Sequence, residues 1–285
     1  MSKESFLLKI PANSELFQKL LFEYSDFSLV RKEDQGFVYS AELEPLTTLV
    51  SDLDSREYLI ETSNEDDWRD KWTEELEPIE ISSLNLKIVP HADEKELTPR
   101  YSGNLIGLFP GRSFGIGHHE TTKIILELFG RHQKVLKGAN VLDFGCGSGI
   151  LGIIASRLGA STVLSIDVDD EALRVTNINT LLNQIRNLES SKSMNGKFNV
   201  LLINTLTTVM EEEFPKIKKY LAPSTKVFAS GFLENQTDSL CKLLSLTEVE
   251  SINRGEWAGL FASRELQSVA HLLMQARKKK STRLP

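Results

Sequence analysis

A glycine-rich loop carries the residues of this sequence that are best suited to hold a small ligand. The apolar run Val141–Phe144 leads into Gly145–Gly149 (GCGSG), and a helix is predicted directly after it, over Ile150–Leu158. Glycines let the backbone turn tightly and approach a ligand closely, and open α/β sheets bind ligands where their strands end. Dinucleotide-binding loops have a further glycine where Ile150 stands here, because pyrophosphate must rest on the helix N-terminus. This departure weakens a dinucleotide interpretation.

Two acidic residues at predicted strand ends refine the choice of ligand. Asp143 precedes the loop, where a carboxylate is poorly placed for pyrophosphate but suits a ligand with a positive end, such as S-adenosylmethionine. Asp167 ends the next predicted strand, 22 residues after Gly145, and can accept hydrogen bonds from both hydroxyls of a ribose. An acid at this spacing also occurs in NAD enzymes, so the discrimination depends on Asp143 and the loop together. A purely structural role for both acids is the alternative.

Asn204 is a third polar residue at the end of a predicted strand, Val200–Ile203. An amide there, opposite the loop, can orient a substrate amine. The alternative is a turn asparagine that caps the next helix, and the residues alone do not separate the two. Asp169 and Asp170, in contrast, are expected to be the N-cap and first turn of a helix rather than ligands.

The sequence predicts no metal site. His118, His119 and Glu120 are a tempting group, but neighbouring residues of a chain point apart and no third ligand is evident. The two cysteines, Cys146 and Cys241, are far apart and in no metal-binding spacing. They argue against a disulfide scaffold and fit a reducing cytosol, so we expect a cytoplasmic protein.

The composition is that of an ordinary globular chain with unevenly distributed charge. The 285 residues are 40% hydrophobic and 26% charged, with a formal net charge of −7. Residues 1–80 hold 8 Lys and Arg against 20 Asp and Glu, a net charge of −12. This front end repels phosphate and attracts basic partners, unless it is only a solubilising surface. No apolar run approaches the roughly 18 residues of a membrane span, and residues 1–10 contain no signal-peptide core.

The elements that must position these residues alternate between strands and helices from about residue 86. This alternation predicts a mostly parallel, doubly wound sheet with helices on both faces, which is a Rossmann-like α/β domain. Two later runs are expected to pair as an antiparallel edge. The predicted strands cover residues 141–144, 162–166, 200–203 and 226–229, the helices cover 150–158, 170–183, 209–221 and 235–246, and the edge comprises 248–252 and 257–262.

The first sixty residues follow the order β-α-β-β-α-β, which predicts a small α+β ferredoxin-like domain. Its strands are expected over residues 6–10, 27–31, 37–41 and 57–61, with helices that begin at Ser14 and Pro45. Residues 66–76 are expected to form an amphipathic helix with Trp68 and Trp72 on one face, which we interpret as a packing helix between domains. The expected organisation is a small domain over 1–62, a linker helix over 63–84, an α/β domain over 85–264 and a basic helical extension over 265–285.

From about Glu65 to Arg264, the sequence resembles the ribosomal protein L-eleven methyltransferase family (PrmA). The most diagnostic segment is Phe114–Thr122 (FGIGHHETT), because generic methyltransferases lack it. The front end resembles the small substrate-recognition domain of that family in the order of its elements. The other matching residues are Asp67–Trp68 with Trp72, Leu142–Leu151, Ile166–Asp169, Asn179, Asn183, Asn204 with Leu206, Ser230–Leu233 and Gly255–Trp257.

The resemblance implies a class I S-adenosylmethionine-dependent methyltransferase domain behind the small domain. It implies that Thr122, Gly145, Asp167 and Asn204 contact the cofactor or shape its pocket. The segment Phe114–Thr122 would close over the methionine end of the cofactor. Together with the loop and the acid before it, the expected cofactor-binding residues are Phe114, Thr122, Asp143, Gly145, Gly147, Gly149, Asp167 and Asn204.

The implied reaction is methyl transfer to lysine and/or N-terminal amines of a basic ribosomal protein. The cofactor brings its own leaving group, so the protein mainly orients the reactants and excludes water. The side-chain carbonyl of Asn204 and a backbone carbonyl of Thr205 are the expected catalytic groups, which aim the lone pair of the amine. His119 is a minor candidate for a base. Burial beside a sulfonium lowers the amine pKa from roughly 10.4 for free lysine.

The sequence departs from the family pattern in and near the expected pocket. Ile116 stands where the family usually has threonine, and Ile203 where alanine is usual. Residues 186–197 lack an acid at the end of the third strand, where methyltransferases commonly hold the adenine amino group, and Glu189 is the only candidate. These departures concern affinity and substrate identity rather than the fold.

The expected partner is a basic protein of the large ribosomal subunit, which the acidic front end would hold. The basic tail, Arg277–Arg283, leaves a contact with ribosomal RNA open, and we expect a monomer without membrane contact. Three alternatives remain: a ribosome-binding module that has lost methyl transfer, a lysine methyltransferase of another protein, and a nucleic-acid methyltransferase. The last is disfavoured because amino-adenine enzymes have an aromatic residue where Thr207 stands, which stacks on the flipped base.

Overall fold

The computed structural model describes residues 4–11, 13–14, 16, 28–32, 35–40, 43–51, 58–64, 77–91, 98–111, 117 and 119–264. The chain divides into two compact units, residues 1–76 and 77–285, and each unit is described by itself. The predicted helix over 66–76 and the predicted extension over 265–285 lie outside the described residues. No helix in these described ranges is long and apolar enough to cross a membrane.

The first unit contains a four-stranded antiparallel sheet in the order β2-β3-β1-β4. Leu8 and Ile10 of β1 are buried with Val38 and Leu46, since alternate residues of a strand face the same side. This strand order is the ferredoxin-like order that the sequence predicts; the helix expected to begin at Ser14 lies almost wholly outside the described residues. The described elements are β1 (Glu4–Pro11), β2 (Ser28–Lys32), β3 (Gln35–Ser40), α2 (Leu43–Leu49) and β4 (Leu59–Asn64).

The second unit begins with a small three-stranded sheet that the sequence analysis did not anticipate. The strands are β5 (Ile79–Ile81), β6 (Leu86–Pro90) and β7 (Leu105–Leu108). β5 and β6 are antiparallel around the turn η1 (Ser82–Leu84), and β7 adds in parallel. Over residues 77–84 the structure therefore differs from the expected linker helix over 63–84, because the apolar residues of β5 recur with the period of 2 that favours a strand.

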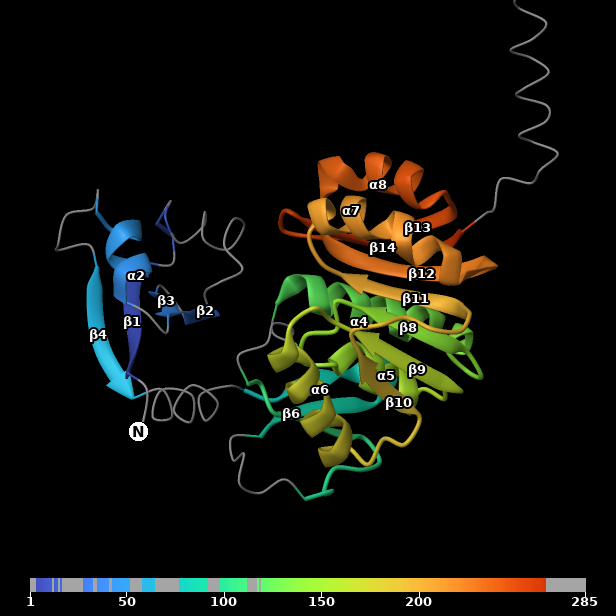
Figure 1. The fold of residues 1–285 in the computed structure, drawn as a ribbon, viewed down its shortest axis with the longest axis horizontal. Coiled ribbons are helices and arrows are strands. Elements are labelled where there is room, and N and C mark those ends of the chain that lie inside the picture. The colour runs from blue at the N-terminus through green and yellow to red at the C-terminus, as the bar shows by residue number, and fades with distance from the viewer. Residues whose placement is uncertain are drawn as a thin grey trace, which may run out of the picture. The chain divides into compact units, whose positions relative to one another are not determined.

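A seven-stranded sheet forms the centre of the second unit, in the order β10-β9-β8-β11-β12-β14-β13 (Figure 1). The strands β10, β9, β8, β11 and β12 are all parallel. Only β14 is reversed, because it is antiparallel to both of its neighbours, β12 and β13. The bounds are β8 (Asn140–Phe144), β9 (Thr162–Ile166), β10 (Leu188–Ser191), β11 (Phe198–Asn204), β12 (Leu221–Leu233), β13 (Leu246–Arg254) and β14 (Trp257–Arg264).

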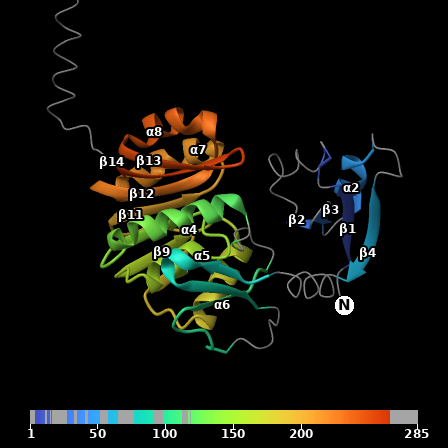
Figure 2. The same cartoon turned by 180° about the vertical axis from the view of Figure 1, so that it is seen from behind.

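Helices cover both faces of this sheet, as the sequence predicts. Val141 and Leu202 belong to one buried core, whereas their neighbours Leu142 and Leu201 belong to the other. Burial on both faces explains why apolar residues stand next to each other in these strands instead of alternating with polar ones. The first core includes α4 and α5, and the small sheet, cyan in Figure 2, lies on that side. The second includes α7 and α8. The helices are α4 (Glu120–His132), α5 (Ile150–Arg157), α6 (Asp170–Leu182), α7 (Thr207–Ile217) and α8 (Thr237–Leu244).

Candidate active site

Three neighbouring parallel strands bring the predicted loop, acid and amide to one edge of the large sheet. The hydrogen-bond register places Ile166 of β9, Phe144 of β8 and Ile203 of β11 in one row. The next residue in each of these three segments is a predicted site residue, namely Asp167, Gly145 and Asn204. This is the carboxyl edge of the parallel strands, where open α/β sheets bind their ligands.

The glycine loop is fixed to the end of β9 on one side and to α6 on the other. The N–H groups of Gly145 and Cys146 donate to the carbonyl oxygen of Ile166, at 2.8 and 3.0 Å. The three predicted glycines have φ between +52° and +77°, a region that residues with a Cβ rarely adopt. A Cβ at Gly149 would lie 2.8 Å from side-chain atoms of Thr176 in α6. The close approach of loop and helix therefore requires glycine at this position.

Asp167 lies at the mouth of the loop. Its Oδ2 accepts a hydrogen bond from the N–H of Gly147 at 3.0 Å, and its Oδ1 accepts one from Asp169 at 3.1 Å. A carboxylate has about four acceptor positions, so this half-buried group keeps capacity for ligand hydroxyls. Val168, the next residue, has 86% of its surface exposed. Asp169 accepts from Glu171 and caps α6, which confirms its predicted role.

Asp143 lies beneath the loop rather than at its mouth. It is 1% exposed, and its Oδ2 accepts from the N–H of Gly152 at 3.1 Å and from the hydroxyl of Ser165 at 3.2 Å. Burial raises the pKa of Asp143 to about 7, against the opposing effect of these two hydrogen bonds. The sequence interpretation directed this carboxylate toward a ligand, whereas the structure places it where it joins β8, β9 and α5.

Asn204 is the last residue of β11, and only one of the two polar groups of its side-chain amide makes a hydrogen bond among the described residues. Its Nδ2 donates to the Oγ1 of Thr122 at 3.3 Å, and Thr122 is fully buried in the first turn of α4. Its Oδ1 is buried and accepts no hydrogen bond from the residues that the structure describes. A buried acceptor without a donor is costly. The alternative role as a helix cap does not hold, because the N-cap residue of α7 is Leu206.

Thr205, the second predicted catalytic residue, is held between the loop and β12. A Cβ at Gly145 would meet the Cβ of Thr205 at 3.8 Å, so Thr205 faces the glycine loop. Gly231 of β12 has φ +94°, and a Cβ there would lie 2.4 Å from the carbonyl oxygen of Thr205. The sequence alone offers no physical reason for glycine at position 231. In the structure, Gly231 lets β12 pass against the backbone that follows Asn204.

The segment before α4 is described only in part. Phe114 and His118 lie outside the described residues. The Nδ1 of His119 caps α4 by accepting from the N–H of Thr121 at 3.3 Å, and its ring centroid lies 5.2 Å from that of Trp257, edge to face. Burial lowers the pKa of His119, so its ring is neutral near pH 7. The described part of the chain contains no cluster of three His, Cys, Asp or Glu residues suited to a metal ion.

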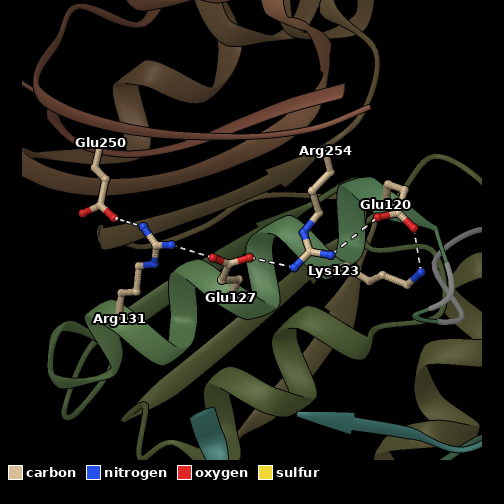
Figure 3. A network of polar contacts seen from close by, with 6 residues as sticks. All are labelled: Glu120, Lys123, Glu127, Arg131, Glu250 and Arg254. Carbon is tan, nitrogen blue, oxygen red and sulfur yellow. Dashed lines mark hydrogen bonds and ion pairs between the residues drawn. The ribbon is translucent and has the colours of Figure 1, made fainter. Parts of the chain in front are cut away.

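A chain of charged residues ties α4 to the hairpin of β13 and β14 (Figure 3). Arg254, at the end of β13, contacts Glu127 at 2.8 Å and Glu120 at 3.7 Å, and Arg131 bridges Glu127 to Glu250. The sequence does not reveal this network, because the pairs that Arg254 makes with Glu120 and Glu127, and the pair of Arg131 with Glu250, join segments more than a hundred residues apart. It holds α4, which carries Thr122, against the hairpin. Its members are Glu120, Lys123, Glu127, Arg131, Glu250 and Arg254.

Glu189, the only candidate for an acid on the adenine side, does not lie at the edge that carries the other site residues. Glu189 of β10 is exposed and pairs with Leu164, two residues before the end of β9. Ser191 instead stands opposite Ile166, in the row that ends the parallel strands. The third strand therefore ends this row in a serine, and the residue that follows it is Lys192 rather than an acid.

The fold and this edge define a class of protein. The Rossmann-like class I methyltransferase fold has three features that this chain shares. These are the strand order β10-β9-β8-β11-β12-β14-β13 with β14 alone reversed, a glycine loop after β8, and an acid after β9. The predicted fold class is thereby confirmed, antiparallel edge included.

Comparison with known proteins identifies the family. Residues 28–265 match the family "Ribosomal protein L11 methyltransferase (PrmA)", and the chain belongs to this family. A ribosomal protein L11 methyltransferase of Caldicellulosiruptor saccharolyticus is 30% identical over 87% of this chain and 85% of its own. A ribosomal protein L11 methyltransferase of Lactobacillus acidophilus is 32% identical over 80% of this chain and 74% of its own. The crystal structure of a ribosomal protein L11 methylase from Lactobacillus delbrueckii subsp. bulgaricus matches with TM-score 0.57 and 30% identity, over 67% of this chain and all of that one. The chain is therefore a methyltransferase.

Proposed function

We propose that this protein transfers methyl groups from S-adenosylmethionine to amino groups of ribosomal protein L11, on lysine side chains and/or the N-terminal amine. Membership of the family and the names of its relatives support the substrate. The observation that carries the proposal is the buried Oδ1 of Asn204, which lacks a donor within the described structure. It lies at the edge that holds the glycine loop, and an amine N–H supplies the donor that it lacks.

The residues at this edge fit S-adenosylmethionine. Asp167 can accept from the ribose hydroxyls while Gly147 and Asp169 hold its carboxylate in place. Val168, which is 86% exposed beside it, offers apolar surface to the adenine ring. Gly145 is exposed and lets the ligand approach the loop backbone. The carboxylate of Asp167, together with that of Asp143 in its ionised form, gives this end of the sheet the negative charge that a cationic cofactor requires.

Asn204 orients the methyl acceptor in this proposal. S-adenosylmethionine, when bound, supplies a methyl group on a positively charged sulfur, which is a good leaving group. The protein must then present a neutral amine with its lone pair in line. Asn204 Oδ1 would accept one N–H of that amine, and the backbone carbonyl of Thr205 a second. Burial at this site disfavours the ammonium form of the amine. His119, whose pKa is lowered by burial, caps the N-terminus of α4, the helix that also carries Thr122.

The acidic front of the chain would recruit the substrate. Residues 1–80 carry a net charge of −12, and complementary charge mainly accelerates encounter and fixes register. Ribosomal proteins that bind RNA are basic, so this charge suits them. A protein that modifies them works where ribosomes are assembled, and we propose the cytoplasm as its compartment.

The test is methylation of purified ribosomal protein L11 by the purified chain and S-adenosylmethionine, followed by intact-mass spectrometry. We expect successive additions of single methyl groups, which peptide mass spectrometry assigns to lysines or to the N-terminus. Binding of S-adenosylmethionine without methylation of L11 would overturn the proposed substrate and favour another protein. Absence of cofactor binding in calorimetry would overturn the proposed enzyme activity and favour a silent binding module.

The variant Asn204→Ala tests the residue that carries the proposal. We expect kcat to fall by about 10- to 100-fold, since orientation of the amine is lost, while the Kd for S-adenosylmethionine changes by less than about threefold. Asn199→Ala is the matched control. Asn199 lies in the same strand but at its other end, where it accepts from the N–H of Asn140, and it should leave kcat unchanged. An unchanged kcat in Asn204→Ala would overturn its role.

A further inference from the structure

Asn179 of α6 is a buried side chain that joins the glycine loop to the extended segment Gly107–Phe109. Its Oδ1 accepts from the N–H of Phe109 at 2.7 Å, and its Nδ2 donates to the carbonyl oxygen of Phe109 at 2.9 Å. The same Nδ2 donates to the carbonyl oxygen of Ser148, within the glycine loop, at 2.8 Å. Asn179 is fully buried, so each of these bonds satisfies groups that water does not reach.

Asn183, one helical turn later, makes the same pair of bonds to a different residue. Its Oδ1 accepts from the N–H of Gly107 at 2.9 Å, and its Nδ2 donates to the carbonyl oxygen of Gly107 at 2.6 Å. Four residues of a helix rise about 6 Å, and two residues of a strand advance about 6.6 Å. The two amides therefore match alternate residues of the extended segment Gly107–Phe109, and they replace a neighbouring strand along its edge.

The two asparagines differ in what their second amide hydrogen does. Asn183 donates it to the carbonyl oxygen of Asn179, within its own helix. Asn179 donates it to the glycine loop instead. Thr176, one turn earlier on α6, donates to the carbonyl oxygen of Gly147 at 3.0 Å. Two consecutive loop carbonyls, those of Gly147 and Ser148, are thus turned toward α6, which fixes the peptide planes between Gly147 and Gly149.

We infer that Asn179 is a positioning residue for the cofactor, which holds the glycine loop in its binding conformation and couples it to Gly107–Phe109. The inference rests on the proposed function for the identity of the ligand. Because one amide bonds both segments, a ligand that orders the loop also orders Gly107–Phe109, and loss of the amide releases both. Loss of the Asn183 amide would release the segment Gly107–Phe109 but not the glycine loop, since Asn183 does not contact the loop.

The matched variants Asn179→Ala and Asn183→Ala separate this role from general stability. Each removes an amide from two backbone groups at the edge of β7, so both are expected to lower the Tm. Calorimetry with S-adenosylmethionine should give a Kd raised by about tenfold in Asn179→Ala and by less than about threefold in Asn183→Ala. With saturating cofactor, kcat and the KM for L11 should stay within about threefold of wild type in both. Equal cofactor affinity in the two variants would overturn the inference.

Hydrogen–deuterium exchange of the ligand-free chain tests the same inference without the cofactor. We expect faster exchange over residues 105–111 in both variants, but faster exchange over residues 145–152 in Asn179→Ala alone. Equal exchange of the loop in the two variants would overturn the inference, even if wild type failed to bind S-adenosylmethionine and the proposed function fell. In wild type, bound cofactor should slow exchange of residues 107–109. Should the alanine variants not fold, Asn179→Asp and Asn183→Asp replace them, since a carboxylate keeps the acceptor and loses the donors.

Discussion

Asn204 donates from Nδ2 to the hydroxyl of Thr122 at 3.3 Å, and this bond leaves Oδ1 as the half of the amide that remains for a ligand. With Nδ2 bonded, Oδ1 is the half that finds no donor among the described residues. Thr122 belongs to α4 and Asn204 to β11, so this hydrogen bond joins a helix to the edge of the sheet. An amide turned the other way would present N–H groups, which cannot accept from an amine.

The first prediction concerns Thr122. Thr122→Val keeps the shape of this buried side chain but removes the acceptor, so the amide of Asn204 is free to turn over. We expect kcat to fall by about tenfold, with little change in the Kd for S-adenosylmethionine. Thr122→Ser restores the hydroxyl and should recover most of the activity. If Thr122→Val were as active as wild type, the proposed control of the amide would be wrong.

The second prediction concerns the stability cost of Asp143. Its pKa of about 7 in the folded chain lies above the ordinary value of 3.8, so the folded state holds this proton more tightly than the unfolded state. Stability therefore falls as pH rises from about 4 to about 7, and then stays level. Asp143→Asn keeps an acceptor for Gly152 and Ser165 without the charge. We expect the Tm of this variant to exceed that of wild type above pH 7. The shift should be about 2–4 °C for each kcal/mol by which the charge of Asp143 lowers the free energy of unfolding. Scanning calorimetry should show this advantage shrinking toward pH 4; a constant difference would contradict the assignment.

The third prediction links the same proton to ligand binding. A cationic cofactor at the loop favours the ionised form of Asp143, because opposite charges lower a carboxyl pKa. Binding should therefore release protons near pH 7, and the Kd of wild type should fall as pH rises from about 6 to about 8. Calorimetry in buffers of different ionisation enthalpy measures the proton release. Asp143→Asn should bind more weakly above pH 7 and lose this proton release. The same pH dependence in the variant would show that another group titrates.

Much of the fold could be predicted from sequence because the central strands are buried on both faces. Val200–Ile203 is continuously apolar and Val141–Phe144 is interrupted only by Asp143, and each run is followed by a turn signal and a helix. The predicted strand over 162–166 has the same bounds as β9. The antiparallel pairing of the last two runs is also confirmed, although β14 lies inside the sheet and β13 forms the edge.

Other features depend on tertiary contacts that a linear pattern does not contain. β10 consists of Leu188–Ser191, a short and mostly polar edge strand without a periodic signal. α4 begins in the polar run after His119, and its buried face becomes apparent only where Ile124, Ile125 and Phe129 recur along it. Asp143 could be placed next to the loop but not beneath it, since the direction of its side chain depends on bonds to two other elements.

The last prediction concerns the ion pairs that hold α4 to the β13–β14 hairpin. Arg254 and Glu127 are 41% and 30% exposed in their side chains, so one such pair contributes little. Arg254 also reaches Glu120, and its loss removes two contacts at once. We expect Arg254→Ala to lower the Tm by about 1–3 °C, and Lys87→Ala, which removes one exposed pair with Glu80, to change it less.

Salt and pH distinguish this network from packing. The hydrogen bond from Arg254 lowers the pKa of Glu127, so this stabilisation is present above the ordinary glutamate pKa of about 4.5 and is lost as pH falls below it. High salt screens exposed pairs, since the Debye length is about 3 Å at 1 M. The difference in Tm between wild type and Arg254→Ala should therefore shrink in concentrated salt and at acid pH. A difference that persists under both conditions would show that Arg254 acts through its aliphatic stem, and the network would then contribute nothing to the position of α4.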